Sequence, residues 1–224
     1  MKRILRLYLS LLTLLVFSLS CFACAGKVDV RLKYYAVFAV NSKDKDVSEA
    51  EFESVMETLR KRLSDNGYTE ASVEKQNSTW IRVEIPEVDD PETILKLIGG
   101  QGKLTFRDSS GTVKLDGSGI ADAYQGTDED GNPCVVLKFT ADGQKKFAQA
   151  TGEISSGSDK TMSIYLGDEL ISSPTCDEKI DNPSAIIKLG SAGTVAQAKT
   201  IASVIKSGSL EVDLELKEWG EVYS

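Results

Sequence analysis

The sequence predicts an α+β fold made of two βαβ or ferredoxin-like subdomains, with antiparallel or mixed sheets and helices on one face. Three observations lead to this prediction. Short apolar runs that alternate with polar residues are typical of half-buried strands. Between them, apolar residues recur every three or four positions, which indicates helices packed on a sheet. A Ser-, Gly- and Asp-rich stretch near residues 108–119 then separates two series of such segments.

The first series, residues 27–108, is expected to form one subdomain. Its first helix begins at Ser48, because Glu51 three residues later completes a capping box. The later run G-G-Q-G lies at the end of a helix, whereas phosphate-binding loops lie at helix starts, so we interpret it as a cap. The expected elements are a strand at 28–40, a helix from Ser48 to Asn66, strands at 71–74 and 79–85, a helix from Asp90 to Gly99, and a strand at 103–107.

The second series is expected to form another subdomain at residues 109–217, followed by a C-terminal tail at 218–224. Its centre has a strand, a helix that begins after Thr140, and a hairpin turning at Gly167-Asp168, which together indicate a split βαβ unit. The expected elements are strands at 135–139, 162–166, 169–172, 185–189 and 210–216, with helices at 141–152 and 195–208.

Composition argues against most enzyme classes. The chain has no histidine, which excludes Ser-His-Asp and Cys-His catalysis and restricts any zinc site to cysteine and carboxylate ligands. No spacing singles out a carboxylate pair, and the acidic stretch 127–132 lacks the ligand pattern of an EF-hand loop. We therefore expect no catalytic residues, no metal and no cofactor. The formal net charge of -8 also disfavours nucleic acid as a partner.

Residues 1–26 are expected to form a targeting segment. Lys2, Arg3 and Arg6 precede an almost wholly apolar run at 7–19, as in a bacterial signal peptide. This organisation predicts that the body of the protein lies outside the cytoplasm.

Two cysteines follow the apolar run and resemble the modification site of a bacterial lipoprotein. Cys24 is favoured over Cys21 for lipidation because Ala23 precedes it, although neither cysteine has the usual Leu three positions earlier. Ordinary cleavage and retention of the segment as a single membrane anchor are the alternatives. Most of these versions tether the body to the membrane.

The other two cysteines are Cys134 and Cys176, which flank the central strand, helix and hairpin. In an oxidising compartment they either pair as a disulfide or stay as two free thiols, and the sequence leaves both alternatives open. The C-x-x-C spacing of Cys21 and Cys24 lies at the end of an apolar run, which is not the setting of a redox site.

Several motifs, taken in order, resemble the large extracytoplasmic domain of SecD, an accessory subunit of the Sec protein-export machinery. In the first half they are R-K-R-L-S-D-N-G-Y-T-E, I-R-V-E-I-P-E-V-D-D-P-E and K-L-T-F-R. In the second half they are V-V-L-K-F-T-A-D-G-Q-K-K-F-A-Q-A-T, I-Y-L-G-D-E-L-I-S-S-P and A-K-T-I-A-S-V-I-K-S-G-S-L. The resemblance implies that the two subdomains are a SecD-like base and head.

The sequence also departs from the family. R-L-K-Y-Y stands where SecD has D-L-x-G-G after its first membrane helix, and Pro86-Glu87 stands where the family has Pro-Gly. SecD continues into five further membrane helices, which carry the acidic residue of proton coupling, whereas this sequence ends at Ser224. We therefore expect that the chain does not drive proton-coupled translocation by itself.

The resemblance implies a non-catalytic, membrane-tethered module that contacts exported or unfolded polypeptide or components of the Sec translocon. An exposed strand or an apolar groove is the expected means of binding, through addition of a strand to a sheet. The alternative is an envelope lipoprotein that reuses the same fold for another structural or interaction role.

Overall fold

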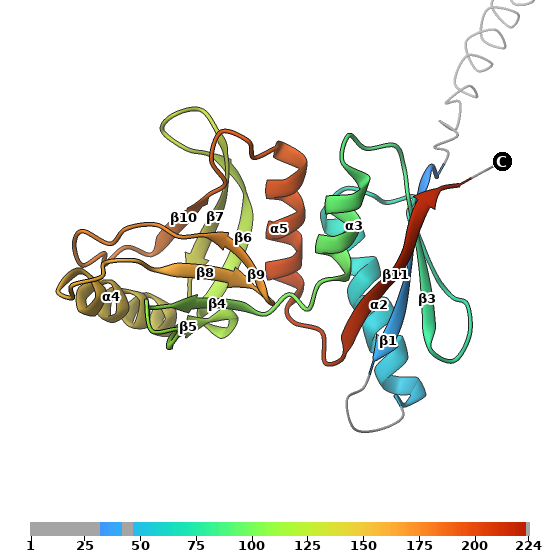
Figure 1. Cartoon of the computed structure of the whole chain (residues 1–224), viewed down its shortest axis with the longest axis horizontal. Helices are drawn as coiled ribbons and strands as arrows, with labels where there is room; N and C mark the ends of the chain where they lie inside the picture. The colour runs from blue at the N-terminus through green and yellow to red at the C-terminus, as the bar shows by residue number, and fades with distance from the viewer. Residues whose placement is uncertain (1–31, 42–46, 223–224) are drawn as a thin grey trace, which may run out of the picture. The chain divides into compact units, whose positions relative to one another are not determined.

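The computed structural model describes residues 32–41 and 47–222 (Figure 1). Over these ranges the chain folds into three antiparallel sheets and four α-helices, so the predicted α+β class is confirmed and no sheet among the described residues is mixed. The expected targeting segment 1–26, with Cys21 and Cys24, lies outside the described residues.

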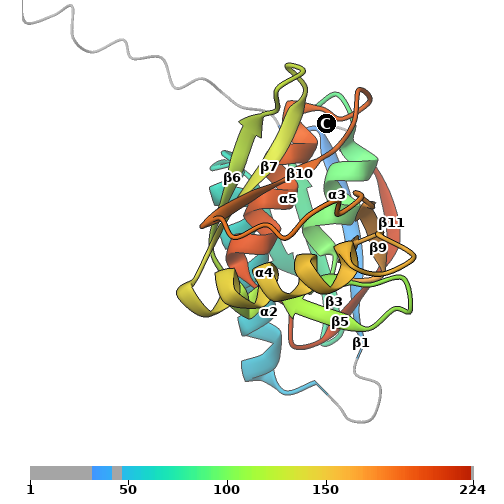
Figure 2. The same cartoon turned by 90° about the vertical axis from the view of Figure 1, so that its left-hand side faces the viewer.

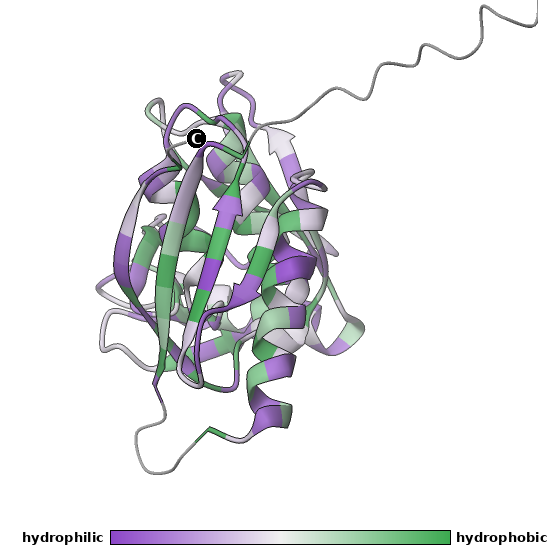
Figure 3. Cartoon of the chain, turned by 90° about the vertical axis from the view of Figure 1, so that its right-hand side faces the viewer, coloured by the Kyte–Doolittle hydropathy of each residue, from purple (hydrophilic) through white to green (hydrophobic). Residues whose placement is uncertain are grey.

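The first sheet has the strand order β11-β1-β3-β2, and two helices cover one of its faces. Its core is built by alternation, because Ala36, Phe38 and Val40 of β1 point to the helices and are at most 6% exposed. The strands of this sheet carry both hydrophobic and hydrophilic residues along their length (Figure 3). The elements are β1 (Tyr34–Asn41), α2 (Glu49–Asp65), β2 (Ser72–Lys75), β3 (Trp80–Ile85), α3 (Pro91–Gly99) and β11 (Asp213–Glu221).

The predicted helix starts of this part are confirmed. The Glu51 amide donates to the Ser48 hydroxyl at 3.3 Å, and the Ser48 amide donates to the Glu51 carboxylate at 3.0 Å. Asp90 caps α3 by accepting a hydrogen bond from the Thr93 amide at 3.2 Å, and Pro91 occupies the first turn. Both helices therefore begin where local sequence signals place them.

The last strand, β11, belongs to the first sheet, whereas the strands that precede it in sequence belong to the other two sheets. β11 pairs antiparallel with β1, with Val40 opposite Leu214 and Tyr34 opposite Glu221. The sequence assigned a strand at 210–216 to the second subdomain and residues 218–224 to a tail, whereas the strand continues to Glu221. Leu210 and Val212 are buried in the first core, so the chain crosses back before β11 begins.

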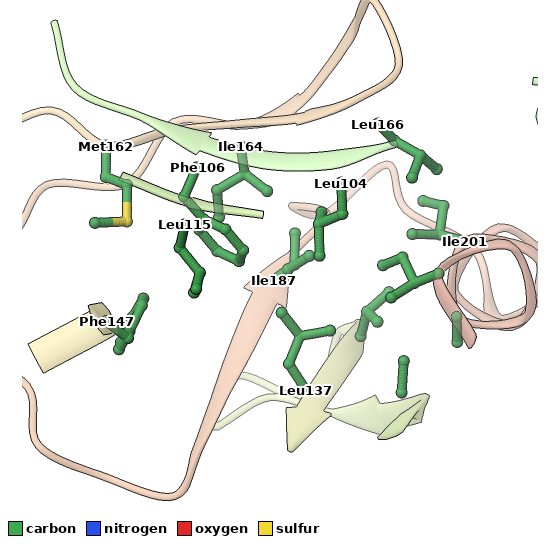
Figure 4. Close-up of a cluster of buried hydrophobic side chains, with 14 of the residues drawn as sticks. Leu104, Phe106, Leu115, Leu137, Phe147, Met162, Ile164, Leu166, Ile187 and Ile201 are labelled. Carbon is green, nitrogen blue, oxygen red and sulfur yellow. The ribbon is translucent and has the colours of Figure 1, made fainter. Parts of the chain in front are cut away.

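The remaining elements form two antiparallel sheets around a second core. The sheets have the orders β5-β4-β8-β9 and β10-β7-β6, and their buried side chains meet with those of α4 and α5 (Figures 2 and 4). The elements are β4 (Leu104–Arg107), β5 (Val113–Asp116), a 3₁₀ turn η1 (Gly117–Gly119), β6 (Ile120–Thr127), β7 (Pro133–Phe139), α4 (Ala141–Ser155), β8 (Ser163–Leu166), β9 (Glu169–Ser172), β10 (Ser184–Lys188) and α5 (Val195–Ser207).

Sheet pairing divides the predicted strand–helix–hairpin unit between two sheets. β7 pairs with β6 and β10, whereas β8 pairs with β4 and β9. β5 and β6 were not predicted, because they lie in or beside the stretch rich in Gly, Ser and Asp. Their extended form comes from pairing with β4 and β7, since such residues have little strand preference of their own.

The start of α4 is packed against η1 at a distance that only glycine permits. A Cβ atom built on Gly143 would lie 1.9 Å from the Gly119 carbonyl oxygen. That oxygen also accepts a hydrogen bond from the amide of Thr140, the N-cap of α4, at 2.9 Å. The backbone of Gly119 is therefore in direct contact with the backbone at the start of α4, and this contact fixes where the helix begins.

We expect Gly143→Ala to destabilise the protein by about 2–3 kcal/mol, because the added methyl forces α4 away from η1. Gly152→Ala in the same helix is the matched control, since its Cβ meets Lys179 at an ordinary 3.5 Å. The control is expected to stabilise the protein by about 0.5–1 kcal/mol. Urea unfolding of the full chain measures both, and equal effects of the two substitutions would contradict the packing described.

Candidate functional site

A buried arginine of α2 joins the C-terminal ends of α3 and α5, two helices that also line a groove at the surface. Arg62 of α2 is 0% exposed, and among the described residues no carboxylate forms an ion pair with it. Burial lowers the pKa of its guanidinium to about 10, which still leaves it charged at neutral pH. Its donors reach neutral oxygens of Ile98 at 2.6 Å, Gly100 at 2.5 Å, Gln101 at 3.5 Å, Ser207 at 3.0 Å and Gly208 at 3.0 Å.

These oxygens lie at the C-terminal ends of α3 and α5, where unpaired carbonyls carry partial negative charge. One cation therefore caps two helices. The two chain segments that leave these helices are also joined directly, because the Leu210 amide donates to the Gln101 carbonyl at 2.8 Å. Gly102 makes room for the arginine, since a Cβ there would lie 2.4 Å from its Nη2.

We expect Arg62→Met to lower the free energy of unfolding by at least about 3 kcal/mol. The substitution leaves several buried carbonyls without a donor, and each costs about 1–3 kcal/mol. Arg60→Met is the matched control, because Arg60 is exposed on the same helix, and we expect it to cost less than about 1 kcal/mol. Urea unfolding measures both, and a loss below about 1 kcal/mol for Arg62→Met would refute the capping role.

A groove opens beside α3 and α5, along the edge strand β9. β9 pairs with β8 on one side, and no described strand pairs with its other side. Three consecutive residues, Glu169, Leu170 and Ile171, line the groove, which has a volume of about 260 Å³. Because the side chains of consecutive strand residues alternate between faces, a groove lined by all three runs along the backbone edge of the strand.

The floor of this groove, which we call the β9 groove, is apolar. Leu97 from α3 and Ile201 from α5 form part of its lining and are 5% and 4% exposed. Ile201 belongs to the same buried cluster as Leu166 of β8 (Figure 4). Leu170 is 51% exposed, so a large apolar side chain is left in contact with water at the edge. Polar residues complete the lining, with Thr93, Gln197 and Glu169 among them.

β9 differs in this respect from the long edge strand β11. β11 presents three exposed charged side chains, Glu215, Lys217 and Glu218, beside the exposed Trp219. Charges on an edge prevent the pairing of another chain with it. β9 is instead short and presents Leu170 beside an apolar floor, so it is the edge better suited to accept an added strand.

Two larger hollows have no aliphatic side chain larger than alanine in their lining. One, of about 690 Å³, lies over α4 and is lined mainly by polar and charged side chains such as Lys145, Glu153 and Lys179. Another, of about 420 Å³, lies beside the edge strand β6 and is lined by Lys199 and Lys206 together with buried Ala123 and Ala202. In the second hollow, buried alanines lie beside the free edge of β6, whereas the β9 groove brings the larger side chains of Leu97 and Ile201 to a free edge.

The structure keeps the two predicted cysteines of the body apart from the groove. Cys134 and Cys176 are both buried free thiols, and neither lines it. Burial raises the pKa of each thiol above its usual value, Asp128 adding to the effect at Cys134 and Asp177 at Cys176. Within residues 32–41 and 47–222 no group of His, Cys, Asp and Glu side chains is arranged to hold a metal ion.

Comparison with known families covers most of the described chain. The model of the SecDF P1 head subdomain matches residues 99–212, and that of the N-terminal part of the protein translocase subunit SecDF P1 domain matches residues 52–111.

The chain belongs to the SecD/SecDF family.

Relatives in this family support the assignment over the same region. The protein translocase subunit SecD of Acidaminococcus fermentans is 31% identical over 163 residues, which cover 73% of this chain and 38% of that protein. SecD of Dictyoglomus turgidum is 32% identical over 163 residues, covering 73% of this chain and 40% of that protein. The chain therefore spans about two fifths of the length of these relatives.

Two solved SecDF structures share the fold. The crystal structure of SecDF in a super-membrane-facing form superposes with a TM-score of 0.64 at 26% identity, covering 94% of this chain and 34% of that one. A second structure, of SecDF described as a membrane component that enhances protein export, gives a TM-score of 0.60 at 26% identity. It covers 82% of this chain and 98% of that one, which matches the P1 region as a unit.

Both P1 models contribute to the β9 groove. Glu169, Leu170 and Ile201 lie within the P1 head match, whereas Thr93 lies in the N-terminal P1 match alone. The sequence predicted the β9 strand and its turn but not the groove, because α3 is some seventy residues away from β9 along the chain. The available signal was E-L-I-S, a hairpin strand with two adjacent large apolar residues.

No helix among the described residues has both the length and the apolar character to cross a membrane.

Proposed function

We propose that this chain acts in protein export as a non-catalytic, extracytoplasmic module that holds segments of exported polypeptide in the β9 groove. Its SecD relatives are named protein translocase subunits, and a SecDF of the same fold is described as enhancing protein export. The match to the P1 head supports a role of this kind, with the Sec translocon as the expected partner.

The free edge of β9 is the observation that carries the proposal. An extended segment laid along this edge completes hydrogen bonds with backbone groups that no described strand uses. Its side chains then reach Leu170 and the apolar floor that Leu97 and Ile201 provide. Main-chain pairing is largely independent of sequence, which suits a module that meets many different unfolded chains.

Leu170→Asp is expected to weaken binding of a permanently unfolded polypeptide about ten-fold. Burial of one half-exposed leucine contributes about 1.5 kcal/mol, and the introduced charge would have to lose water. The measurement is fluorescence anisotropy of labelled, reduced and carboxymethylated lactalbumin with the full chain in detergent.

Val113→Asp is the matched control, because Val113 is 49% exposed on the edge strand β5 and lies outside the groove. It should leave the affinity unchanged. Equal affinities for the two variants and the unaltered chain would exclude the β9 groove as the binding site.

The proposal includes a membrane tether supplied by residues 1–26. The described chain begins at residue 32, close in sequence to Cys24, and the start of β1 lies opposite the end of β11 at one end of the first sheet. A lipid on Cys24 would hold this end of the body near the membrane surface.

Mass spectrometry of the protein purified from a bacterial membrane tests the tether. We expect a mature N-terminus at Cys24 that carries acyl chains, and Cys24→Ser should abolish the modification. Cys21→Ser is the control and should leave the acylated N-terminus in place. An acylated Cys21, or an intact Met1, would contradict the assignment.

A further inference from the structure

The edge strand β6 lies beside a hollow that the proposed function does not use. β6 pairs with β7 on one side, and no described strand pairs with its other side. Helix α5 packs beside this strand (Figure 1). Both elements line the hollow of about 420 Å³, which we call the β6 hollow, and the turn that ends α2 completes its wall. The hollow therefore lies next to a free strand edge.

Alternate residues of β6 turn their backbone groups toward the free side of the strand. The Asp128 amide donates to the Asn132 carbonyl at 2.9 Å where the hairpin of β6 and β7 closes. Along an antiparallel pair, residues bonded to the partner strand alternate with residues whose N–H and C=O groups point away from it. In the register of β6 and β7, positions 128, 126 and 124 bond to β7, so the backbone groups of Ala123 and Gln125 point away. Both residues line the β6 hollow.

The two outward amides differ in whether a side chain covers them. The Ala123 amide donates to the carboxylate of Asp122 at 3.0 Å, which protects this part of the edge. The Gln125 amide faces the same way, and among the described residues no side chain accepts a hydrogen bond from it. A carbonyl of an added strand would supply the acceptor.

Helix α5 supplies the floor of the β6 hollow and two lysines. Lys199, Ala202, Ser203 and Lys206 line the hollow and recur at the spacing of one helix face. Ala202 and Ser203 are 4% and 3% exposed, so the floor is made of small side chains. The lysines are seven residues apart, about 10.5 Å along the helix axis, with this floor between them in sequence.

One of the lysines is left without an acidic partner. Among the described residues no carboxylate forms an ion pair with Lys199, whereas Lys206 lies 3.9 Å from the Asp122 carboxylate. Asp65, which also lines the hollow, is bonded to Lys61 at 2.5 Å. These five residues place three lysines against two carboxylates, in a chain whose net charge is -8. A local excess of positive charge attracts carboxylates.

We propose that the β6 hollow is a second polypeptide site, which binds extended segments that carry acidic side chains. The class of partner rests on the proposed function, but the site is separate from the β9 groove, since the two share no lining residue. The outward backbone groups of β6 pair with the segment, and Lys199 sets the preference for negative charge.

Three fluorescein-labelled peptides test the charge preference. They are Thr-Glu-Thr-Glu-Thr-Glu-Thr and its counterparts with Gln or Lys in place of every Glu. Alternation puts the variable side chains on one face of an extended segment, so the comparison does not depend on register.

With the full chain in detergent at low salt, we expect the Glu peptide to bind about two- to five-fold tighter than the Gln peptide, which is the effect of one solvent-exposed ion pair. The Lys peptide should bind most weakly. Added salt should reduce the preference. Equal binding of the Glu and Gln peptides at low salt would overturn the charge selection.

Lys199→Gln should make the Glu and Gln peptides bind equally, and Lys199→Glu should make the Gln peptide the tighter of the two. Lys145→Gln and Lys145→Glu are the matched controls, because Lys145 is an exposed lysine of α4 outside the hollow. Both controls should keep the preference for the Glu peptide. If the substitutions at the two positions change the preference alike, net charge accounts for it and the assignment to the β6 hollow fails.

Two N-methylated versions of the Glu peptide test the strand pairing. One carries methyl groups on the amides of its three glutamates, and the other on the amides of the three threonines that follow the first. Every second amide of an added strand faces β6, so one version should bind as the parent does and the other about ten-fold more weakly. Equal affinities of the two versions would overturn the pairing with β6.

Leu170→Asp separates this site from the β9 groove. It should weaken binding of unfolded lactalbumin and leave the affinity for the Glu peptide unchanged. Loss of Glu-peptide binding in this variant would place the peptide in the β9 groove, which overturns the β6 site and leaves the proposed function standing. Lactalbumin binding that Leu170→Asp does not change, together with a Glu preference that Lys199→Gln removes, would refute the β9 groove and support the β6 site.

Discussion

The guanidinium of Arg62 is the contact on which the arrangement of the two cores depends. It lies where the chain leaves α3 for β4 and where it leaves α5 for β11, so it touches both connections between the cores. α3 belongs mainly to the first core and α5 mainly to the second, and the two helices pack side by side (Figure 1). By capping both, one side chain fixes the floor of the β9 groove.

A cation without a carboxylate partner is costly to bury, which its lowered pKa reflects. The cost is offset because five oxygens accept from the planar fork of donors, and several of them are at helix ends that favour positive charge. A lysine has neither the reach in several directions nor the fixed geometry to replace it. The glycine at position 102 is then a consequence of the arginine, since any side chain there would occupy its place.

The sequence predicted what depends on neighbouring residues and missed what depends on distant ones. Three helices were found because Ser48, Asp90 and Thr140 are capping residues at their starts, and the last helix because its apolar residues recur at helical spacing; these signals are local. The pairing of β11 with β1 was missed, since nothing in an alternating strand says which edge it joins. The groove was missed for the same reason, because its floor and its edge come from segments that only the fold brings together.

The contrast between the edges of the sheets is the main support for the proposal that the β9 groove binds polypeptide. Free strand edges invite pairing with other chains, and the charged Glu215, Lys217 and Glu218 disfavour it along β11, where Trp219 is also exposed. At β9 the protection is incomplete, because a large apolar side chain and unused backbone groups stand beside an apolar floor.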